Sequence, residues 1–378
     1  MSDHTGTSRR LDPAELEDIK LRTDLVGLVS SAGVTLRRTG STFTGPCPFC
    51  GGGKNATRFE VKPAQRVWVC AACEDGGDAI AFVRKHEGVG FREAVERLGG
   101  TQVLSDEARK KLTQKAQARE REDQRRAERR IATAREMWTA AGPLEGSAGM
   151  AYFAGRGIPF GDGERAHSLR FQPALPYYFS PPAAKPFVIH TGPAIIAAIV
   201  QADDTISGVH CTYLADDCAS KLALDPREGE AMKAKKIRGQ AARGVIRLSP
   251  SAPLLLIGEG IETTRSAFVV MRSAGIECAA WAGVSLGNMA GASLGRGTKH
   301  PDKPNIWVPD WQPDTDHPGL MPPDWAEEIV LLGDGDSDRA MTTARLTCAA
   351  ARFTAAGKRV RIAWADEGLD FNDMLNNK

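Results

Sequence analysis

Two pairs of cysteines constrain this sequence more than any other feature. Cys47 and Cys50 form one C-x2-C pair, and Cys70 and Cys73 form a second pair after a gap of 19 residues. Two such turns can bring four thiolates to the corners of a tetrahedron, which is the geometry that Zn²⁺ takes in structural sites. Because a closed site of this kind leaves no open coordination position, we expect the zinc to fold the module and not to catalyse a reaction.

The segment between the two pairs predicts a small antiparallel sheet. Residues 57–61 and 66–70 are predicted to be its two strands, and residues 62–65 the turn between them. The side chains expected to be exposed on this ribbon are Arg58, Lys62, Arg66 and Trp68. Cations beside an aromatic ring suit single-stranded nucleic acid, because phosphates meet the charges while bases stack on the ring. Trp68 fits a core position equally well, and both interpretations stay open here.

Length and charge limit the class of protein. The chain has 378 residues, which indicates two or three domains at roughly 150 residues per domain. Its 49 Lys and Arg against 47 Asp and Glu give a net charge of +2, which argues against a uniformly basic nucleic-acid coat. No apolar run approaches the ~20 residues of a membrane span, and the first ten residues lack the apolar core of a signal peptide. We therefore predict a cytoplasmic protein without a membrane partner, in a compartment that disfavours disulfides and so supports a metal site.

Composition divides the chain into five segments. They are a disordered N-terminus (1–12), a zinc-binding domain (13–100), a charged helical linker (101–136), a mixed α/β segment (137–250) and a metal-binding α/β domain (251–378). The linker is predicted to be one long helix that starts at residues 105–107. From Asp106 to Glu136 it carries eleven Lys and Arg and seven Asp and Glu, with too few apolar residues for a core-facing stripe. We expect an exposed helix, and its alternative role is to follow a nucleic-acid backbone.

Acidic residues follow two predicted strands in the C-terminal segment. Apolar runs at 253–258 and 329–333 alternate with predicted helices, and this pattern favours a parallel sheet. Glu259 follows the first strand, and Asp334 and Asp336 follow the second, at the sheet edge where such folds bind ligands. Clustered carboxylates repel one another unless a cation lies between them. Oxygen ligands favour Mg²⁺ or Mn²⁺, which are the usual partners of phosphates.

The N-terminal part of the sequence resembles the zinc-binding (CHC2-like) domain of bacterial DnaG-type primases. The resemblance spans residues 23–98, and the matching stretches are 23–26, 45–50, 68–73, 76–83 and 91–98. The family commonly has a histidine as its second zinc ligand, where this chain has Cys50. A thiolate in that place keeps the site tetrahedral and makes it more anionic.

Residues 253–376 resemble a Toprim domain, the metal-binding fold of primases, topoisomerases and some nucleases. The resemblance is carried by residues 258–263, 280–288, 333–336 and 368–375. It implies that Glu259, Asp334 and Asp336 bind the catalytic metal, with Asp338 as an outer ligand and Asp370 as a further acid of the site. The longer primases often carry an acid four residues after the first glutamate. Here that position is Thr263, with Glu262 beside it, and the pattern is closer to primases of phages and mobile elements, as is the insertion at 301–324.

The middle segment supplies basic residues for such a site. Residues 150–158 resemble the start of the primase catalytic core, and residues 208–214 predict a strand in it. The cations selected as nucleotide- or template-binding residues are Lys221, Lys235, Lys236 and Arg238. A polymerase site needs such cations beside its acids to hold triphosphate and template backbone, although a solvated basic loop would show the same composition. His210 is expected to be packed or hydrogen-bonded and not to be a ligand.

The expected fold is therefore an α/β multidomain chain with a small zinc ribbon and flanking helices, a helical linker, and a primase core with a Toprim-type parallel sheet. The resemblances imply a DNA primase that makes short RNA primers on single-stranded DNA from ribonucleoside triphosphates, for a phage, plasmid or integrated element. A P-loop motif is absent from the sequence and the chain stops after the Toprim-like part, so we expect a separate replicative helicase as partner. The alternatives are a Toprim-type nuclease, a non-catalytic zinc and Toprim clamp on DNA, and a degenerate primase.

Overall fold

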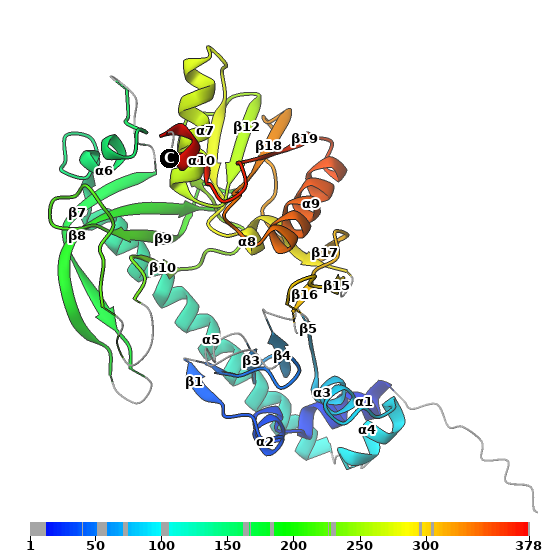
Figure 1. Cartoon of the computed structure of the whole chain (residues 1–378). Helices are drawn as coiled ribbons and strands as arrows, with labels where there is room; N and C mark the ends of the chain where they lie inside the picture. The colour runs from blue at the N-terminus through cyan, green and yellow to red at the C-terminus, as the bar shows by residue number, and fades with distance from the viewer. Residues whose placement is uncertain are drawn as a thin grey trace, which may run out of the picture. The chain divides into compact units, whose positions relative to one another are not determined.

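The computed structural model describes residues 13–39, 41–50, 59–70, 75–99, 106–161, 166, 168–181, 185–225, 227, 232–294, 297–303 and 306–376. The chain divides into two compact units, which are shown in Figure 1. The first comprises residues 1–126 and 299–307, and the second comprises residues 127–298 and 308–378. The predicted disordered segment 1–12 lies outside the described residues.

The first unit combines a five-stranded antiparallel sheet with short helices. Its helices are α1 (Pro13–Arg22), α2 (Leu25–Ser31), α3 (Ala79–Glu87) and α4 (Phe91–Arg97). Its strands are β1 (Arg37–Thr39), β2 (Thr42–Gly45), β3 (Phe59–Lys62), β4 (Val67–Cys70) and β5 (Asp75–Gly77), and they pair in chain order. The predicted ribbon is confirmed, because β3 and β4 are antiparallel neighbours with Val61 opposite Trp68.

Local sequence signals set the ends of these helices. Asp24 and Asp78 are N-caps whose side chains accept hydrogen bonds from the backbone of Val26 and Ala81. Gly88 ends α3 with a φ of 68°, a left-handed conformation that glycine adopts without strain. The capped α3 then packs Phe82 into the same core cluster as Phe59 and Trp68 of the sheet.

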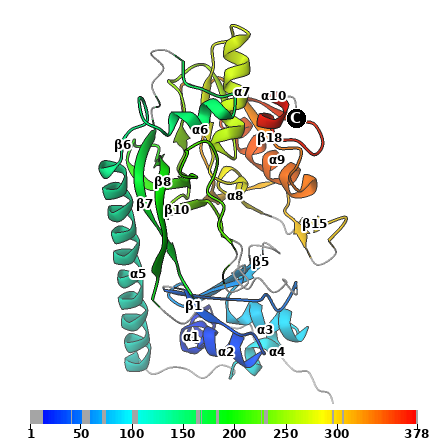
Figure 2. The same ribbon diagram turned by 60° about the vertical axis from the view of Figure 1, so that its left-hand side comes forward.

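The charged segment forms one long helix, α5 (Asp106–Ala140). The prediction of a helix is confirmed, but its description as exposed along its whole length is wrong. Ala134 is fully buried, and Met137 and Trp138 pack against the core of the second sheet. Figure 2 shows this end of α5 beside β7 (Leu169–Phe179). Ala134 is small enough to let the helix approach the sheet closely, and Met137 and Trp138 anchor the last turns. In the sequence, the surrounding charged residues mask this short apolar stripe.

An antiparallel sheet follows the long helix. In spatial order it consists of β10 (Lys235–Gly239), β9 (Ile206–Tyr213), β8 (Phe187–Val200), β7 and β6 (Gly142–Pro143), and α6 (Met150–Gly155) lies between β6 and β7 in sequence. The predicted strand at 208–214 corresponds to β9. The pairing of β10 with β9 places Lys235 opposite Thr212 and Ile237 opposite His210.

The C-terminal sheet is the parallel sheet that the sequence predicts. Its order is β11 (Ile246–Arg247), β13 (Ala279–Ala282), β12 (Leu254–Gly258), β18 (Glu328–Gly333) and β19 (Arg359–Trp364). All pairs are parallel except β11 with β13, so an antiparallel strand forms one edge. The helices are α7 (Ile261–Ser273), α8 (Leu286–Ala290), α9 (Arg339–Ala355) and α10 (Phe371–Leu375).

Helices cover both faces of this sheet, as Figure 1 shows for α7 and α9. Leu256 of β12 belongs to the core cluster that contains Phe268 of α7. Its neighbours Leu255 and Ile257 point to the opposite face, into the cluster that contains Phe353 of α9. Because both faces are buried, the strand reads as a continuous apolar run.

The insertion predicted at 301–324 adds small β elements. β14 (Gly291–Ser293) pairs with β17 (Pro313–Pro318), and β15 (Thr298–Lys299) pairs with β16 (Trp307–Val308). Arg352 of α9 is buried and donates hydrogen bonds to the carbonyls of Ala290 and Asp314, which ties β17 to the helix. Within the described part of the chain, none of the helices combines the length and apolar character of a membrane span.

Candidate metal centres and active site

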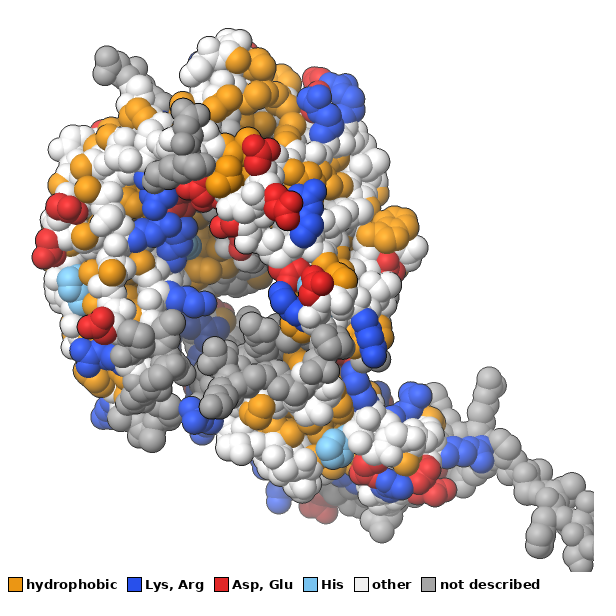
Figure 3. All heavy atoms as spheres, in the orientation of Figure 1, with side chains coloured by type: hydrophobic (Ala, Val, Ile, Leu, Met, Phe, Trp, Pro, Cys, Tyr) orange, Lys and Arg blue, Asp and Glu red, His pale blue; other side chains and the backbone are white. Residues whose placement is uncertain are grey.

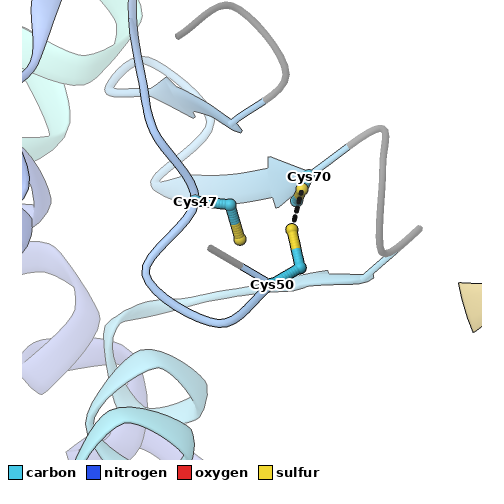
Figure 4. Close-up of side chains that lie close together, drawn as sticks. All are labelled: Cys47, Cys50 and Cys70. Carbon is cyan, nitrogen blue, oxygen red and sulfur yellow. Dashed lines mark hydrogen bonds between the residues drawn. The ribbon is translucent and has the colours of Figure 1, made fainter. Parts of the chain in front are cut away.

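Three of the four predicted zinc ligands lie together in the first unit. Cys47 and Cys50 come from the turn after β2, and Cys70 is the last residue of β4; Figure 4 shows their sulfur atoms turned toward one another. All three are buried, and their Sγ atoms lie within 4.8 Å of one another. Cys73 lies outside the described residues, so its role as fourth ligand stays a prediction.

The surroundings of these sulfurs suit a metal ion. The Sγ atoms of Cys50 and Cys70 are 3.9 Å apart, and the backbone N–H of Phe49 donates to the sulfur of Cys47 at 3.4 Å. Backbone donors of this kind stabilise thiolates that ligate metals. A cluster of buried sulfur donors selects zinc over the hard cations that prefer oxygen.

The basic side chains of the ribbon are only partly where the sequence places them. Lys62 and Arg66 are partly exposed, whereas Arg58 lies outside the described residues. Trp68 is 1% exposed, so its prediction as a base-stacking residue is wrong and the core alternative is confirmed. It lies two residues before Cys70 on β4 and therefore faces the same way, toward the metal core.

Acidic residues meet at the carboxyl ends of the parallel strands. Glu259 follows β12, Asp334 follows β18, and Asp370 is the N-cap of α10; all three line one pocket of about 230 Å³. Asp336 is exposed and does not line the pocket, but its charge raises the pKa of both Asp334 and Glu259. Asp338 caps α9 by accepting a hydrogen bond from the backbone of Met341 at 3.1 Å.

Burial makes the charge of Asp334 unfavourable. It raises the pKa of Asp334 to about 6, with smaller contributions from the charges of Asp370, Asp336 and Glu259. Thr263 donates a hydrogen bond to Oδ2 of Asp334 at 3.1 Å, while Oδ1 is buried without a partner among the described residues. Burial also raises the pKa of Glu259. A carboxylate oxygen that is buried and unsatisfied beside other acids fits a position for a cation.

A donor set made only of carboxylate oxygens suits Mg²⁺ or Mn²⁺ better than zinc. The acids are not gathered as tightly as the cysteines, which form the one described group of three or more donors close enough to hold an ion by themselves. Mg²⁺ commonly takes only one or two carboxylates and completes its shell with water and substrate phosphates. Glu259 and Asp334 are the residues that would hold it.

Cations line the same pocket on its other side. Arg156, which follows α6, lies there together with Lys221 and Lys235. Figure 3 shows Lys and Arg side chains gathered beside acidic ones on this face of the second unit. Of the four cations that the sequence selects, the structure therefore brings Lys221 and Lys235 to the acids.

The other two selected cations lie apart from the pocket. Lys236 donates a hydrogen bond to the carbonyl of Tyr178 at 2.7 Å, and its Nζ is 3.6 Å from the centre of the Tyr177 ring. Burial lowers the pKa of Lys236 to about 8. Lys236 and Arg238 alternate with Lys235 along β10, so they point to the opposite face of the strand.

Further residues that line the pocket, or support those that do, were not singled out by the sequence. Glu262 bonds both lysines, and Tyr152 donates a hydrogen bond to Glu262 at 2.6 Å. Arg156 is fixed by Asn372 of α10, which accepts a hydrogen bond from its guanidinium and donates one to its carbonyl. Val284 lines the pocket with a φ of 70°, which β-branched residues rarely adopt. The position of Glu262 beside the expected acid is the one signal that could have found any of them.

His210 also lines the pocket, from β9. Burial lowers its pKa to about 4, so the ring is neutral at pH 7. Its Nδ1 is buried without a hydrogen-bond partner among the described residues. The expectation that the ring is packed or hydrogen-bonded and not a ligand stays a prediction.

Comparison with known families identifies the first unit. Residues 11–114 match the family described as CHC2 zinc finger. The N-terminal domain is a CHC2 zinc finger. Together with the buried cysteines, this match supports Zn²⁺ as its metal. Residues 128–248 match a second family, described as a domain of unknown function (DUF7146).

The similar curated proteins are DNA primases. The chain is 37% identical over 83 residues to the DNA primase of Thermotoga maritima, which is 22% of this chain and 14% of the relative. It is 34% identical over 98 residues to the DNA primase of Pseudomonas putida, which is 25% of this chain and 14% of the relative. The match thus spans about one seventh of these relatives. It confirms the resemblance to DnaG-type primases, and an origin in a phage or mobile element stays a prediction.

Two similar solved structures are also primases. One is the Aquifex aeolicus primase with its zinc-binding and RNA polymerase domains, at 15% identity and a TM-score of 0.35, covering 96% of this chain and 82% of that chain. The other is the DnaG primase catalytic domain bound to single-stranded DNA, at 13% identity and a TM-score of 0.35, covering 68% of this chain and 78% of that chain.

Proposed function

We propose that this chain is a DNA primase that joins ribonucleotides into short primers on single-stranded DNA. The observation that carries the proposal is the pocket in which Glu259 and Asp334 face Lys221, Lys235 and Arg156. A polymerase site needs this juxtaposition, because acids bind the catalytic cation and basic groups neutralise the triphosphate. The match to the CHC2 zinc finger family supports a template-directed reaction, since the similar curated proteins carry the name DNA primase.

Each wall of the pocket has its own part in the proposed reaction. Mg²⁺ or Mn²⁺, when bound, would act as a Lewis acid on the phosphate that is attacked. Glu259 and Asp334 would hold this ion in a Toprim-type arrangement, with Asp336, Asp338 and Asp370 as outer groups. Lys221, Lys235 and Arg156 would bind the triphosphate and stabilise the leaving pyrophosphate. The volume of about 230 Å³ is suited to phosphate groups, and the base and sugar would lie outside it.

The remaining basic residues are proposed to contact the template. Lys62 and Arg66 are partly exposed on the zinc ribbon and could bind phosphates of single-stranded DNA. Lys236 and Arg238 lie on the face of β10 away from the pocket, so we assign them to template contacts and not to the nucleotide. We further propose that the protein acts in the cytoplasm, with a separate replicative helicase, in replication of a phage, plasmid or integrated element.

A primer-synthesis assay tests the function and the acid site together. The substrates are single-stranded DNA, labelled ribonucleotides and Mg²⁺, and the wild type is compared with the Asp334→Ala/Asp336→Ala double variant. We expect short RNA products from the wild type and none from the double variant. Asp324→Ala is the matched control, because Asp324 is an exposed acid outside the pocket, and it should keep full activity.

Other outcomes identify the alternatives. Primer synthesis that survives in the double variant would contradict the assignment of the acids. Metal-dependent cleavage of DNA without nucleotides would favour the Toprim-type nuclease. Binding of DNA without synthesis or cleavage would favour the clamp, for which a pocket that pairs buried acids with cations has no evident use.

A further inference from the structure

Glu262 is a buried carboxylate behind the cation wall of the pocket. It lies in the first turn of α7 and is 5% exposed. Three side chains from three separate parts of the second unit form hydrogen bonds or ion pairs with the Glu262 carboxylate. Tyr152 of α6 approaches Oε1 at 2.6 Å, Lys235 of β10 approaches Oε2 at 2.8 Å, and Lys221 approaches Oε1 at 3.1 Å.

The two lysines divide their donors between this carboxylate and the pocket. Each ammonium group has three N–H donors, and one contact to Glu262 leaves the others for a ligand. The side chain of Lys221 is 32% exposed and that of Lys235 is 36% exposed, whereas the side chain of Glu262 is only 7% exposed. The three groups together carry a net charge of +1, so the site keeps an excess of positive charge while each lysine is held in place.

A single turn of chain connects both walls of the pocket. Glu259 belongs to the acid wall, and Glu262, three residues later, holds the cation wall. Thr263 then returns to the acid wall, where it donates to Asp334. A residue that served only to pack α7 would not need a charge here, because an apolar side chain of similar volume fills a buried space at lower desolvation cost.

We propose that Glu262 is a positioning residue that holds Lys221 and Lys235 in the geometry that binds the polyphosphate of the nucleotide and the pyrophosphate product. This inference rests on the proposed function of the pocket. It adds a residue that does not itself touch substrate and whose effect is transmitted through the two lysines. Buried charges of this kind are expensive to desolvate, and they persist where the partners they orient are needed.

The charges around Lys221 give the proposal a measurable pH dependence. The titratable groups around the two lysines and Glu262 are Tyr152, Arg156, His210, Glu259, Asp334 and Asp370. Burial lowers the pKa of Lys221, the charges of Lys235 and Arg156 lower it further, and the charge of Glu262 raises it. When Glu262 is neutralised, Lys221 should therefore lose its proton at a lower pH, and anion binding should weaken from that pH upward.

The experiment measures binding of inorganic pyrophosphate with Mg²⁺ to the full chain by calorimetry from pH 6.5 to 9.5. In Glu262→Gln we expect about tenfold weaker binding at pH 8.5, because both lysines lose their charged partner, and an alkaline decline that begins at lower pH than in the wild type. Glu277→Gln is the matched control, because Glu277 is exposed and lies outside the pocket. This variant should bind pyrophosphate as tightly as the wild type does.

A second variant keeps the test valid if Glu262→Gln does not fold. Tyr152→Phe removes one hydrogen bond and no charge. The factor by which it weakens pyrophosphate binding should therefore be the same at every pH. Wild-type affinity and pH profile in both variants would overturn the proposal. If the wild type makes no primers but the variants change pyrophosphate binding as expected, the primase proposal fails and the role of Glu262 stands.

Discussion

Asp334 shows how one side chain can be favourable for function and unfavourable for folding. Its pKa is raised from 3.8 to about 6, chiefly because the carboxyl group is buried, and one of its oxygens has no partner among the described residues. The folded chain therefore binds a proton at Asp334 more readily than the unfolded chain does. Below pH 4 the group is neutral in both states, and its unfavourable effect appears as the pH rises from about 4 to 6.

We therefore predict that Asp334→Asn stabilises the metal-free protein while it abolishes primer synthesis. The free energy of unfolding should rise by roughly 2 kcal/mol at pH 8, after allowance for partial solvent exposure of the site, and should hardly change at pH 4. Denaturant titrations at the two pH values, in the presence of a chelator, measure both effects. Asp324→Asn should change neither, and an equal gain at both pH values would show that the charge is not the cause.

At the residue scale, the sequence points to residues that line the pocket where side-chain chemistry and chain position coincide. Glu259 and Asp334 were predicted because each follows an apolar run, and the carboxyl ends of parallel strands meet at one edge. Trp68 was ambiguous because its side chain suits both stacking and packing, and only the shared face with Cys70 resolves the two. Glu262 was not predicted as a site residue, because its partners come from positions 152, 221 and 235, far away in sequence.

At the scale of elements, α7 connects the sheet to the segment after α6. Arg265 of α7 is fully buried and donates to the carbonyls of Ile158 and Pro159. Its guanidinium carbon lies 3.6 Å from the centre of the Phe160 ring. Through these contacts the helix fixes the segment that carries Arg156 into the pocket.

Loss of this anchor should destabilise the second unit. We predict that Arg265→Met lowers the free energy of unfolding by about 3 kcal/mol, because the buried carbonyl of Ile158 and the carbonyl of Pro159 both lose a charged donor. Urea titration monitored by circular dichroism measures the change. Arg272→Met, at the other end of the same helix, should cost less than about 0.5 kcal/mol, as is usual for surface positions. Equal effects of the two substitutions would contradict the anchor.

The elements themselves were more predictable than their mutual orientation. Helix α9 is one of the helices expected to alternate with the apolar strands, and an aspartate cap begins it. The face of β10 that meets the acids could not be predicted. It depends on the pairing of β10 with β9, which sends Lys235 toward the pocket and Lys236 away from it. Alternation identifies two faces of a strand but does not say which neighbour each will meet.

At the scale of the whole molecule, the two units have separate cores. The zinc finger packs Phe59, Trp68 and Phe82 around the buried cysteines. The second unit has its own apolar clusters on both faces of the parallel sheet. A metal that holds together a domain of this size supplies much of its folding free energy, so its removal should unfold that domain and leave the second core intact.

We therefore predict that Cys47→Ser/Cys50→Ser separates the two functions of the chain. The variant should lose its zinc, as measured by atomic spectroscopy, and the thermal transition of the zinc finger, as measured by calorimetry. It should also lose primer synthesis on single-stranded DNA, because the domain that we propose to contact the template is no longer folded. Pyrophosphate should still bind at the acid and cation pocket with the affinity of the wild type, since that site is built entirely from residues of the second unit.

The control is Cys278→Ser, which replaces a buried cysteine outside the zinc finger and should keep both zinc and synthesis. A simultaneous loss of pyrophosphate binding in the double variant would mean that the two units fold as one.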